Sequence, residues 1–215
     1  MEQMTGVAEK ATENLDWALA LSRIHIDYMA QLFREGIDYF LLGMDIAEGT
    51  RNIMAEQFLR YREAYPDLRS IGVFNRNGEE VFGVNQEGRT AGGQVSNEPW
   101  FNEILETDGV YFSSLMPSAE AGDTVLMMGR RYMDMQGEPA LVFAVEVAGA
   151  YFTGSLEATR IGENGYVYVT DHSGAVISHP DRSQLFSTNI TDYSFGREIL
   201  LNRSGIIEFD WQGAE

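Results

Sequence analysis

The feature that most limits the fold is a helical stripe of unusual length. From about Thr5 to Met44, apolar or small residues recur at spacings of three and four with no proline between them: Leu15, Ala18, Ser22, Ile26, Met29, Phe33, Ile37, Phe40 and Met44. This pattern predicts one helix of roughly 40 residues, where an average helix has about 11–12. Such a helix either packs on a sheet or forms a stalk or dimer interface, and different parts of it can do both. A second helix is predicted from about Arg51 to Ala64, closed by Tyr65-Pro66.

From Leu68 onward the hydrophobic period changes to two, which is typical of strands. The segments 71–74, 75–78 and 79–82 read as strand, tight turn and strand. A short helix is predicted after Pro99, with Asn97 or Glu98 as its cap. Three more strands are predicted at Val110–Ser114, Thr124–Tyr132 and Ala140–Val147. A hairpin, a helix and a three-stranded meander, in this order, are PAS-like.

The first hairpin recurs 96 positions later, where Ile71 corresponds to Val167, Asn75 to Asp171, Gly78 to Gly174 and Val81 to Ile177. The second copy is short, because only four residues follow Ile206–Trp211. The prediction is therefore an α+β fold with a long N-terminal helix and two PAS-like antiparallel-sheet modules, the second reduced or truncated. The predicted segments are a helical stalk with the second helix (1–66), a first module (67–155) and a second module (156–215).

Composition excludes several classes of function. Thirty-three acidic residues against 15 basic ones give a formal charge of −18, which would repel nucleic acid and anionic membrane surfaces. The absence of cysteine excludes disulfides, thiolate metal sites and cysteine nucleophiles. No apolar run approaches the roughly 20 residues of a membrane-spanning helix, so the transmembrane helices of any receptor are expected to lie outside this sequence.

The order of several motifs carries a family resemblance. After the long helix and first hairpin come Pro99-Trp100-Phe101, 109–113, 165–169, 171–174 and 177–181. In this order the chain resembles the double-Cache family of periplasmic sensor domains of chemoreceptors, sensor histidine kinases and diguanylate cyclases. The resemblance implies a membrane-distal module that binds a small molecule and a membrane-proximal module that relays the signal. It also implies a periplasmic domain of an inner-membrane protein, with neither a catalytic activity nor a cofactor.

The resemblance also implies a ligand site. Family members that bind amino acids hold the carboxylate with an arginine two residues before an aromatic pair, and a later tyrosine and acid hold the amino group. Here Trp100 and Phe101 match the pair, Glu98 replaces the arginine, Met116 lies near the tyrosine position and Glu146 lies near the acid. The predicted ligand is an amine or another small polar molecule. A carboxylate stays open because either Arg130 or Arg131 must face the pocket side of its strand. The predicted site comprises Glu98, Trp100, Phe101, Tyr111, Phe112, Arg130 and Glu146, with Tyr111 and Phe112 on opposite faces.

Simpler alternatives remain open. Trp100 can be a core aromatic residue, and Glu146 can face solvent. His172 and His179 lie near Asp171 and Asp181, but no third ligand stands at a recognisable spacing, so no metal site is predicted. The chain can also be a ligand-free PAS-like module that dimerises through the N-terminal helix or, less expected, a small hydrolase without a recognisable motif. An enclosed pocket beside Trp100 would favour sensing, and a collapsed pocket together with an apolar helix–helix interface would favour the interaction module.

Overall fold

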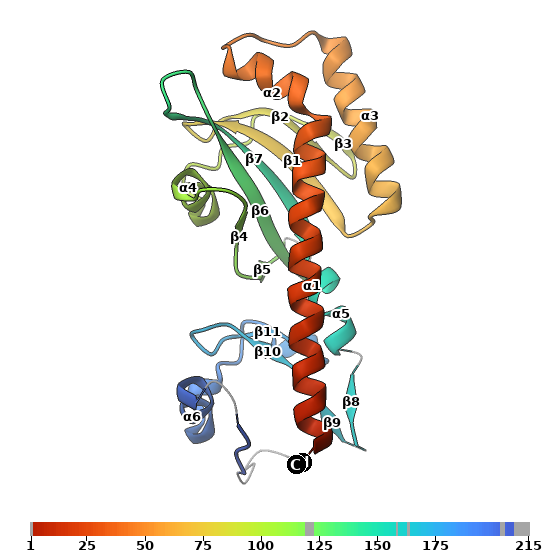
Figure 1. Cartoon of the computed structure of the whole chain (residues 1–215), viewed down its shortest axis with the longest axis vertical. Helices are drawn as coiled ribbons and strands as arrows, with labels where there is room; N and C mark the ends of the chain where they lie inside the picture. Colours follow the sequence, from red (N-terminus) through yellow and green to blue (C-terminus); the bar gives the residue numbers. More distant parts are fainter. Residues whose placement is uncertain (1, 119–122, 158, 163, 203–204, 209–215) are drawn as a thin grey trace. The chain divides into compact units, whose positions relative to one another are not determined.

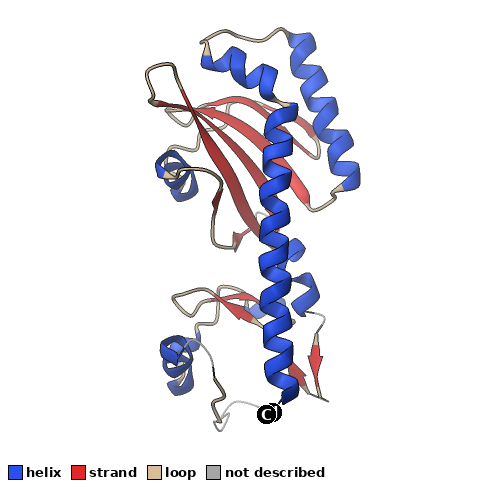
Figure 2. Cartoon of the chain, viewed as in Figure 1, coloured by secondary structure: helices blue, strands red, loops and turns tan. Residues whose placement is uncertain are grey.

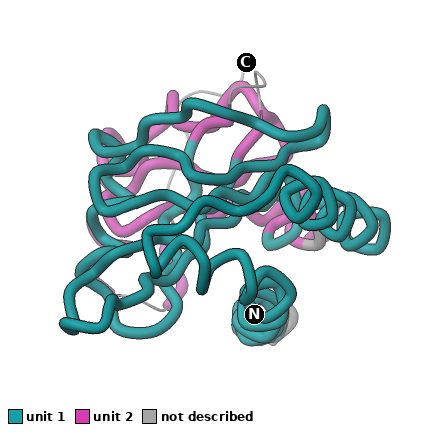
Figure 3. Tube along the Cα trace, turned by 90° about the horizontal axis from the view of Figure 1, so that it is seen from above, with its two compact units in different colours: residues 1–116, 125–152 teal, residues 117–124, 153–215 magenta. Residues whose placement is uncertain are grey.

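The computed structural model describes residues 2–118, 123–157, 159–162, 164–202 and 205–208 (Figure 1). It divides into two compact units, one of residues 1–116 and 125–152 and the other of 117–124 and 153–215 (Figure 3). The predicted helical segment 1–66 and most of the predicted first module thus lie in one compact unit.

The first unit begins with three helices, α1 (Glu2–Leu32), α2 (Arg34–Leu41) and α3 (Glu48–Ala64). The prediction of a single helix up to Met44 is wrong, because a turn at Phe33 separates α1 from α2. The α2 helix ends in a Schellman-type cap, in which Gly43 N donates to Phe40 O and Met44 N donates to Tyr39 O. Gly43 adopts the positive φ (67°) that this cap requires.

The helical stripe faces the core as predicted over its central part. Ser22, Ile26, Met29, Phe33 and Ile37 are buried, whereas Met44 at the end of the stripe is exposed. The α3 helix adds three further buried side chains, those of Met54, Ala55 and Phe58. These residues form the apolar layer that covers one face of the sheet.

The sheet has seven strands in the order β3-β2-β1-β7-β6-β4, with β5 also paired to β6. Their bounds are β1 Leu68–Asn75, β2 Glu80–Asn85, β3 Gly88–Thr90, β4 Tyr111–Phe112, β5 Met116–Pro117, β6 Thr124–Met133 and β7 Pro139–Ala148. The helices α1 to α3 lie on one side, which we call the helix face, and α4 (Pro99–Glu106) lies on the other, which we call the α4 face (Figures 1 and 2).

Alternation along β7 assigns side chains to these two faces. Phe143 faces the helices, with its ring centroid 6.1 Å from that of Phe33. Val142 and Ala144 instead belong to the apolar cluster beneath α4. Because side chains alternate along a strand, Glu146 shares the α4 face with Ala144.

The second unit is smaller and contains short elements. The α5 helix (Ala150–Glu157) leads into it, followed by the two-stranded sheets β8–β9 (Arg160–Ile161 and Gly165–Tyr166) and β10–β11 (Val169–Thr170 and Val176–Ser178). Two 3-10 turns, η1 (Arg182–Gln184) and η2 (Ile190–Asp192), and the α6 helix (Ser194–Asn202) complete it. The described residues after α6 form no strand, and residues 209–211 of the segment Ile206–Trp211 lie outside the described residues.

The two predicted hairpins have the same turn. The Asn75 side chain accepts hydrogen bonds from Asn77 N (2.9 Å) and Glu79 N (3.1 Å). The Asp171 side chain accepts them from Ser173 N (2.8 Å) and Ala175 N (3.0 Å). In both turns the fourth residue is a glycine with positive φ, 80° at Gly78 and 88° at Gly174, so both sequences meet the same backbone requirement.

The similarity extends beyond the turn. Val95 N donates to Gly78 O and Ile190 N donates to Gly174 O, both at 2.9 Å. A bridge joins Glu79 to Gln94 in the first unit, and another joins Ala175 to Asn189 in the second. A helix follows each docked segment, at Pro99 and at Ser194. The repeated element therefore comprises the hairpin, the segment that docks on it and the following helix.

Candidate functional site

The predicted site centres on α4, whose start differs from the prediction. Glu98 is the N-cap residue, but its side chain makes no capping hydrogen bond and is exposed, so the predicted side-chain cap is wrong for this residue. The Asn102 side chain instead donates to the carbonyls of Ser96 (3.1 Å) and Glu98 (3.3 Å). Pro99 occupies the first turn, as expected for a residue without an N–H.

Trp100 and Phe101 lie in the apolar layer between α4 and the sheet. They are 7 % and 1 % exposed, and with Phe74 they form three edge-to-face ring pairs with centroid distances of 5.9 to 6.4 Å. Ile104, Val142 and Ala144 complete this cluster. Both aromatic residues therefore have a core role.

A row of small residues crosses the α4 face beside this cluster. Gly83 pairs with Gly72, Gly72 with Ala144, and Ala144 with Gly129, on four adjacent strands. The Phe74 ring occupies the space that a side chain at Gly72 would need, and Ile104 occupies the space at Gly129. Phe74 and Ile104 therefore fill the space above the glycine and alanine residues of this row.

Glu146 lies on the other side of this row from the aromatic cluster. It is half-buried on the central strand β7, between its cross-strand neighbours Ser70 and Met127. Its carboxylate accepts a hydrogen bond from Ser70 Oγ (3.1 Å). Among the ion pairs of the described residues, none involves Glu146. The simpler alternative, in which this side chain faces open solvent, does not fit its half-buried position.

Tyr111 and Phe112 point to opposite faces, as predicted. Tyr111 packs against the α4 cluster, and its hydroxyl donates to the Glu103 carboxylate. Burial and this hydrogen bond raise the pKa of Tyr111, so its hydroxyl stays protonated. Phe112 lies under the Arg23 guanidinium, 5.0 Å from its ring centroid, on the helix face. The structure therefore does not bring Phe112 together with Trp100.

The two arginines of β6 also point to opposite faces of the sheet. Arg130 lies on the helix face, where it pairs with Asp27 (2.8 Å) and stacks on Tyr132. Arg131 lies on the α4 face, where it donates to Leu105 O (2.6 Å) and pairs with Asp108. The prediction of Arg130 as a site residue is thus not supported by its position, because the sheet separates it from Trp100.

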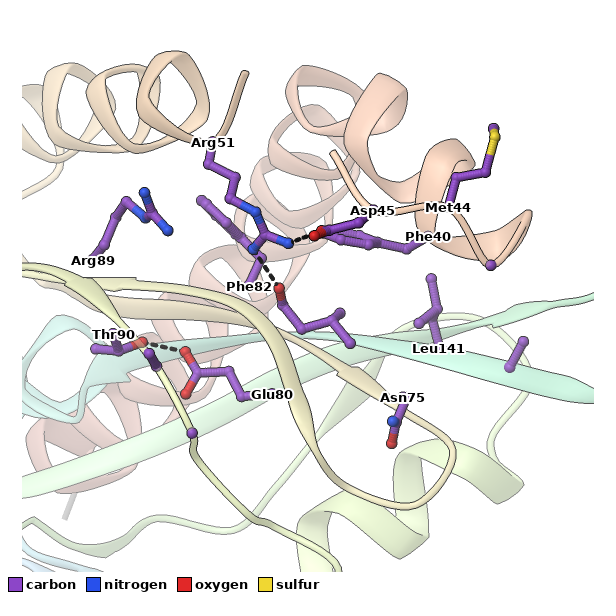
Figure 4. Close-up of a pocket in the computed structure, with 15 residues that line it drawn as sticks. Phe40, Met44, Asp45, Arg51, Asn75, Glu80, Phe82, Arg89, Thr90 and Leu141 are labelled. Atoms are coloured by element: carbon purple, nitrogen blue, oxygen red, sulfur yellow. Dashed lines mark hydrogen bonds and ion pairs between the residues drawn. The ribbon is translucent and has the colours of Figure 1, made fainter. Parts of the chain in front are cut away.

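A cavity of about 540 Å³ lies elsewhere, at the edge of the sheet near α2 and α3 (Figure 4). Arg51 reaches into it, donates to Val81 O (2.8 Å), pairs with Asp45 and lies 5.6 Å from the Phe40 ring centroid. Glu80 on the other side accepts from Thr90 Oγ1 and from Gly93 N (3.0 Å).

The charged groups of this cavity already have partners within the protein. The Arg51 and Arg89 side chains are paired with Asp45 and Glu48 respectively. The guanidinium of Arg51 joins the α2–α3 connection to β2, which is a structural role. No motif in the sequence identifies this cavity, because its lining residues are widely spaced along the chain.

His179 and Asp171 of the second unit have local roles. His179 Nδ1 accepts a hydrogen bond from Asp181 N (2.9 Å), and Asp171 serves the hairpin turn. Within the described residues, no three acidic or histidine side chains gather as metal ligands would. Across the same residues, no helix is both long and apolar enough to cross a bilayer.

Comparisons with known proteins identify the fold. No family model matches the chain, and no curated protein sequence matches it. Among solved structures, the ligand-binding domain of the Pseudomonas aeruginosa PAO1 amino-acid chemoreceptor PctC with GABA is similar at a TM-score of 0.63 and 17 % identity, over 88 % of this chain and 81 % of that one. The ligand-binding domain of the Pseudomonas fluorescens chemoreceptor CtaA with L-serine gives 0.60 and 15 %, over 86 % and 74 %.

The sensory domain of the Campylobacter jejuni chemoreceptor Tlp3 is similar at a TM-score of 0.60 and 12 % identity, over 94 % of this chain and 82 % of that one. At these identities the similarity concerns the fold, and it covers both compact units. The chain therefore has an α+β fold similar to that of these sensory domains, in agreement with the fold that the sequence resemblance predicted.

Proposed function

We propose that this chain is the extracytoplasmic sensory domain of a bacterial transmembrane receptor and that it binds a small molecule with an amino group. The fold similarity to chemoreceptor sensory domains supports the class of protein. The position of Glu146 carries the proposal for the ligand. It is a half-buried carboxylate on the same sheet face as Trp100, and its one described side-chain partner is a neutral hydroxyl.

The charges on the α4 face favour an amine over a simple carboxylate. Glu98 stands where the resemblance places a carboxylate-binding arginine, and Arg131 is already paired with Asp108. A cationic amino group near Glu146 gains a charge-assisted hydrogen bond, whereas a carboxylate meets repulsion there. GABA and L-serine, named with two of the similar chemoreceptor domains, both carry an amino group.

The ligand would bind along the small-residue row, between Glu146 and the aromatic cluster. Neither cavity described in this structure is lined by Trp100. The closed cluster by itself fits the ligand-free alternative, and sensing at this place needs Phe74 to rotate away from Gly72. The ligand then stabilises the rotated state, because only a difference in affinity between two states can shift their populations. The first module would act as the membrane-distal binding module and the second as the membrane-proximal relay.

A thermal-shift screen against amines, amino acids, carboxylates and purines tests the proposal. A ligand present at a hundred times its dissociation constant stabilises the protein by about 2.7 kcal/mol. We expect amines or amino acids to raise the melting temperature and simple carboxylates to leave it unchanged. A response to carboxylates alone would contradict the proposal.

Two variants locate the site. Glu146→Gln keeps the size of the side chain and removes its charge, so it should abolish the shift caused by amines. Glu138→Gln is the matched control, because it removes an exposed charge in the β6–β7 turn. Trp100→Ala should also abolish the shift, provided that circular dichroism shows a folded protein.

The α1 helix supports a second candidate function, homodimerisation. Its residues Trp17, Ile24 and Tyr28 lie on one side of the helix, and Trp17 and Ile24 are 68 % and 65 % exposed. Sedimentation analysis of the wild type and of Ile24→Glu tests this function. A dimer that the substitution dissociates would support it, and a wild-type monomer at high concentration would exclude it.

A further inference from the structure

A second, smaller cavity lies on the helix face of the first unit and has an unusual lining. Its volume is about 190 Å³, which corresponds to roughly six water molecules at ~30 Å³ each. The α1 helix contributes Ser22, His25 and Met29, and the end of α3 with the following turn contributes Tyr61, Tyr65 and Asp67. The remaining lining residues are Ala64, Pro66, Leu68, Met128, Val147 and Tyr151.

Aromatic rings form much of the wall. The ring of Tyr65 stacks on Tyr61, with 4.6 Å between centroids, and meets His25 edge-on at 4.5 Å. Tyr28 does not line the cavity, but its ring packs against Tyr61 with 5.7 Å between centroids. Tyr151 adds a further ring to the lining. We call His25, Tyr61, Tyr65 and Tyr151 with Asp67 the tyrosine cage.

The charge of the cage favours a cation. Of the described residues that line it, none is lysine or arginine. The Asp67 carboxylate is half-buried and takes part in no ion pair among the described residues. Burial lowers the pKa of His25, so its ring is neutral at neutral pH. Burial, and then the neighbouring tyrosines, raise the pKa of Tyr61 to about 12, so its hydroxyl is neutral too.

We propose that the tyrosine cage binds a small organic cation of the quaternary or methylated ammonium class. The π faces of several rings attract such a cation, and Asp67 supplies the opposite charge. Met29, Leu68, Met128 and Val147 make part of the lining apolar. Methyl groups on the nitrogen suit this apolar part, whereas a primary ammonium group would need a hydrogen-bond acceptor for each of its N–H groups.

This site goes beyond the proposed function, because it lies on the opposite face of the sheet from Glu146. The side chain of Met128 lines the cage, whereas that of its neighbour Met127 packs against the α4 cluster. Tyr65 is 38 % exposed, so the cage is accessible from solvent without movement of the sheet. The chain therefore offers two separate sites for cations of different chemistry.

Calorimetric titration with choline, and with its uncharged isostere that has carbon in place of nitrogen, tests the cage. We expect choline to bind at one site per chain and the isostere to bind at least about tenfold more weakly, since only the cation gains from the ring faces and Asp67. Equal binding of the isostere would show a merely apolar cavity. No binding of choline would likewise overturn the proposal.

Substitutions separate the contribution of the ring from that of the hydroxyl. Tyr65→Leu should weaken choline binding about tenfold or more, whereas Tyr65→Phe keeps the π face and should change it by less than about threefold. Asp67→Asn should also weaken it. Unchanged affinity in both Tyr65→Leu and Asp67→Asn would overturn the assignment.

A measurement on the wild-type protein locates the bound choline without relying on variants that could fail to fold. In a spectrum of methyl-labelled methionine, choline should shift the signals of Met29 and Met128 and leave those of Met116 and Met127 in place. Shifts confined to Met116 and Met127 would place choline on the α4 face and overturn the cage. The Glu146→Gln variant should bind choline like the wild type, so failure at one site is distinguishable from failure at the other.

Discussion

The two faces of the seven-stranded sheet are closed in different ways. On the α4 face, a short helix presses Trp100, Phe101 and Ile104 onto a row of small residues, and little space remains. On the helix face, long helices supply a thick apolar layer, but the smaller cavity lies within it and the larger one lies beside it at the edge of the sheet. The same sheet thus carries a closed aromatic cluster on one side and open, aromatic-walled space on the other.

The difference shows that aromatic residues alone do not identify a binding site. The Trp-Phe pair on α4 is conspicuous in the sequence, yet both rings pack against Phe74 in the core. The tyrosines at 61, 65 and 151 form no recognisable motif, yet their rings surround space. Rings pack against one another in both places, and the difference is that a cavity remains beside the tyrosines.

The largest expected effect comes from truncation of the α4 cluster. Phe101→Ala should lower the free energy of unfolding by about 3–5 kcal/mol, because a fully buried ring is replaced by a cavity. Tyr65→Leu, at a partly exposed ring beside existing space, should cost clearly less. Urea unfolding of both variants measures the difference, and equal costs would contradict the contrast between the two faces.

A second prediction concerns the small-residue row. Gly129→Val should destabilise the protein by about 1–3 kcal/mol, because its new side chain meets Ile104 and the Phe143 carbonyl oxygen. Gly6→Ala is the control, since an added Cβ meets nothing there and alanine favours a helix. Thermal unfolding measures the stability of both variants. If the melting temperature of Gly129→Val equalled that of the control, α4 would not pack closely on the sheet.

The ion pair on the helix face should contribute less. Asp27→Asn removes the partner of Arg130 and should cost about 0.2–1 kcal/mol, because both side chains are partly exposed. The cost should shrink at about 1 M salt, where such pairs are screened. A loss that persists in high salt would indicate a role other than charge pairing.

The smallest expected effect is a pH dependence from the tyrosine cage. Burial lowers the pKa of His25 from its ordinary 6.5, so the unfolded chain binds a proton more readily than the folded one. The free energy of unfolding should therefore fall as the pH drops below 6.5, and the loss should be complete below the folded pKa. His25→Gln should flatten this slope between the two values, as chemical unfolding at several pH values would show. If stability changed with pH equally in this variant and in the wild type, His25 would not be the source of the pH dependence.

Much of the fold was predictable from local patterns. The spacing of Ile26, Met29 and Phe33 identified the buried side of α1, and the turn residues from Asn75 to Gly78 identified the hairpin and its second copy. The division of the long helix was not predictable, because Phe33 continues the apolar stripe through the turn. The exposed tail of the stripe at Met44 was missed for a similar reason, since the Schellman cap at Gly43 ends α2 before it.

The candidate site was predictable only in part. Because side chains alternate along a strand, Tyr111 and Phe112 must point to opposite faces of the sheet, and so must Arg130 and Arg131. The alternation does not show which member of each pair faces α4. That choice depends on which helices cover each face, which contacts between distant segments determine.

By itself, the sequence determined the α+β class, the tandem hairpins and a carboxylate at position 146 on an otherwise apolar strand. These follow from periodicity and turn chemistry, which are local properties of the chain. The tertiary structure alone decided that Trp100 is packed against Phe74 and that His25, Tyr61, Tyr65 and Tyr151 meet around a cavity. A cavity is what remains after side chains from remote segments have packed, so no local pattern encodes it.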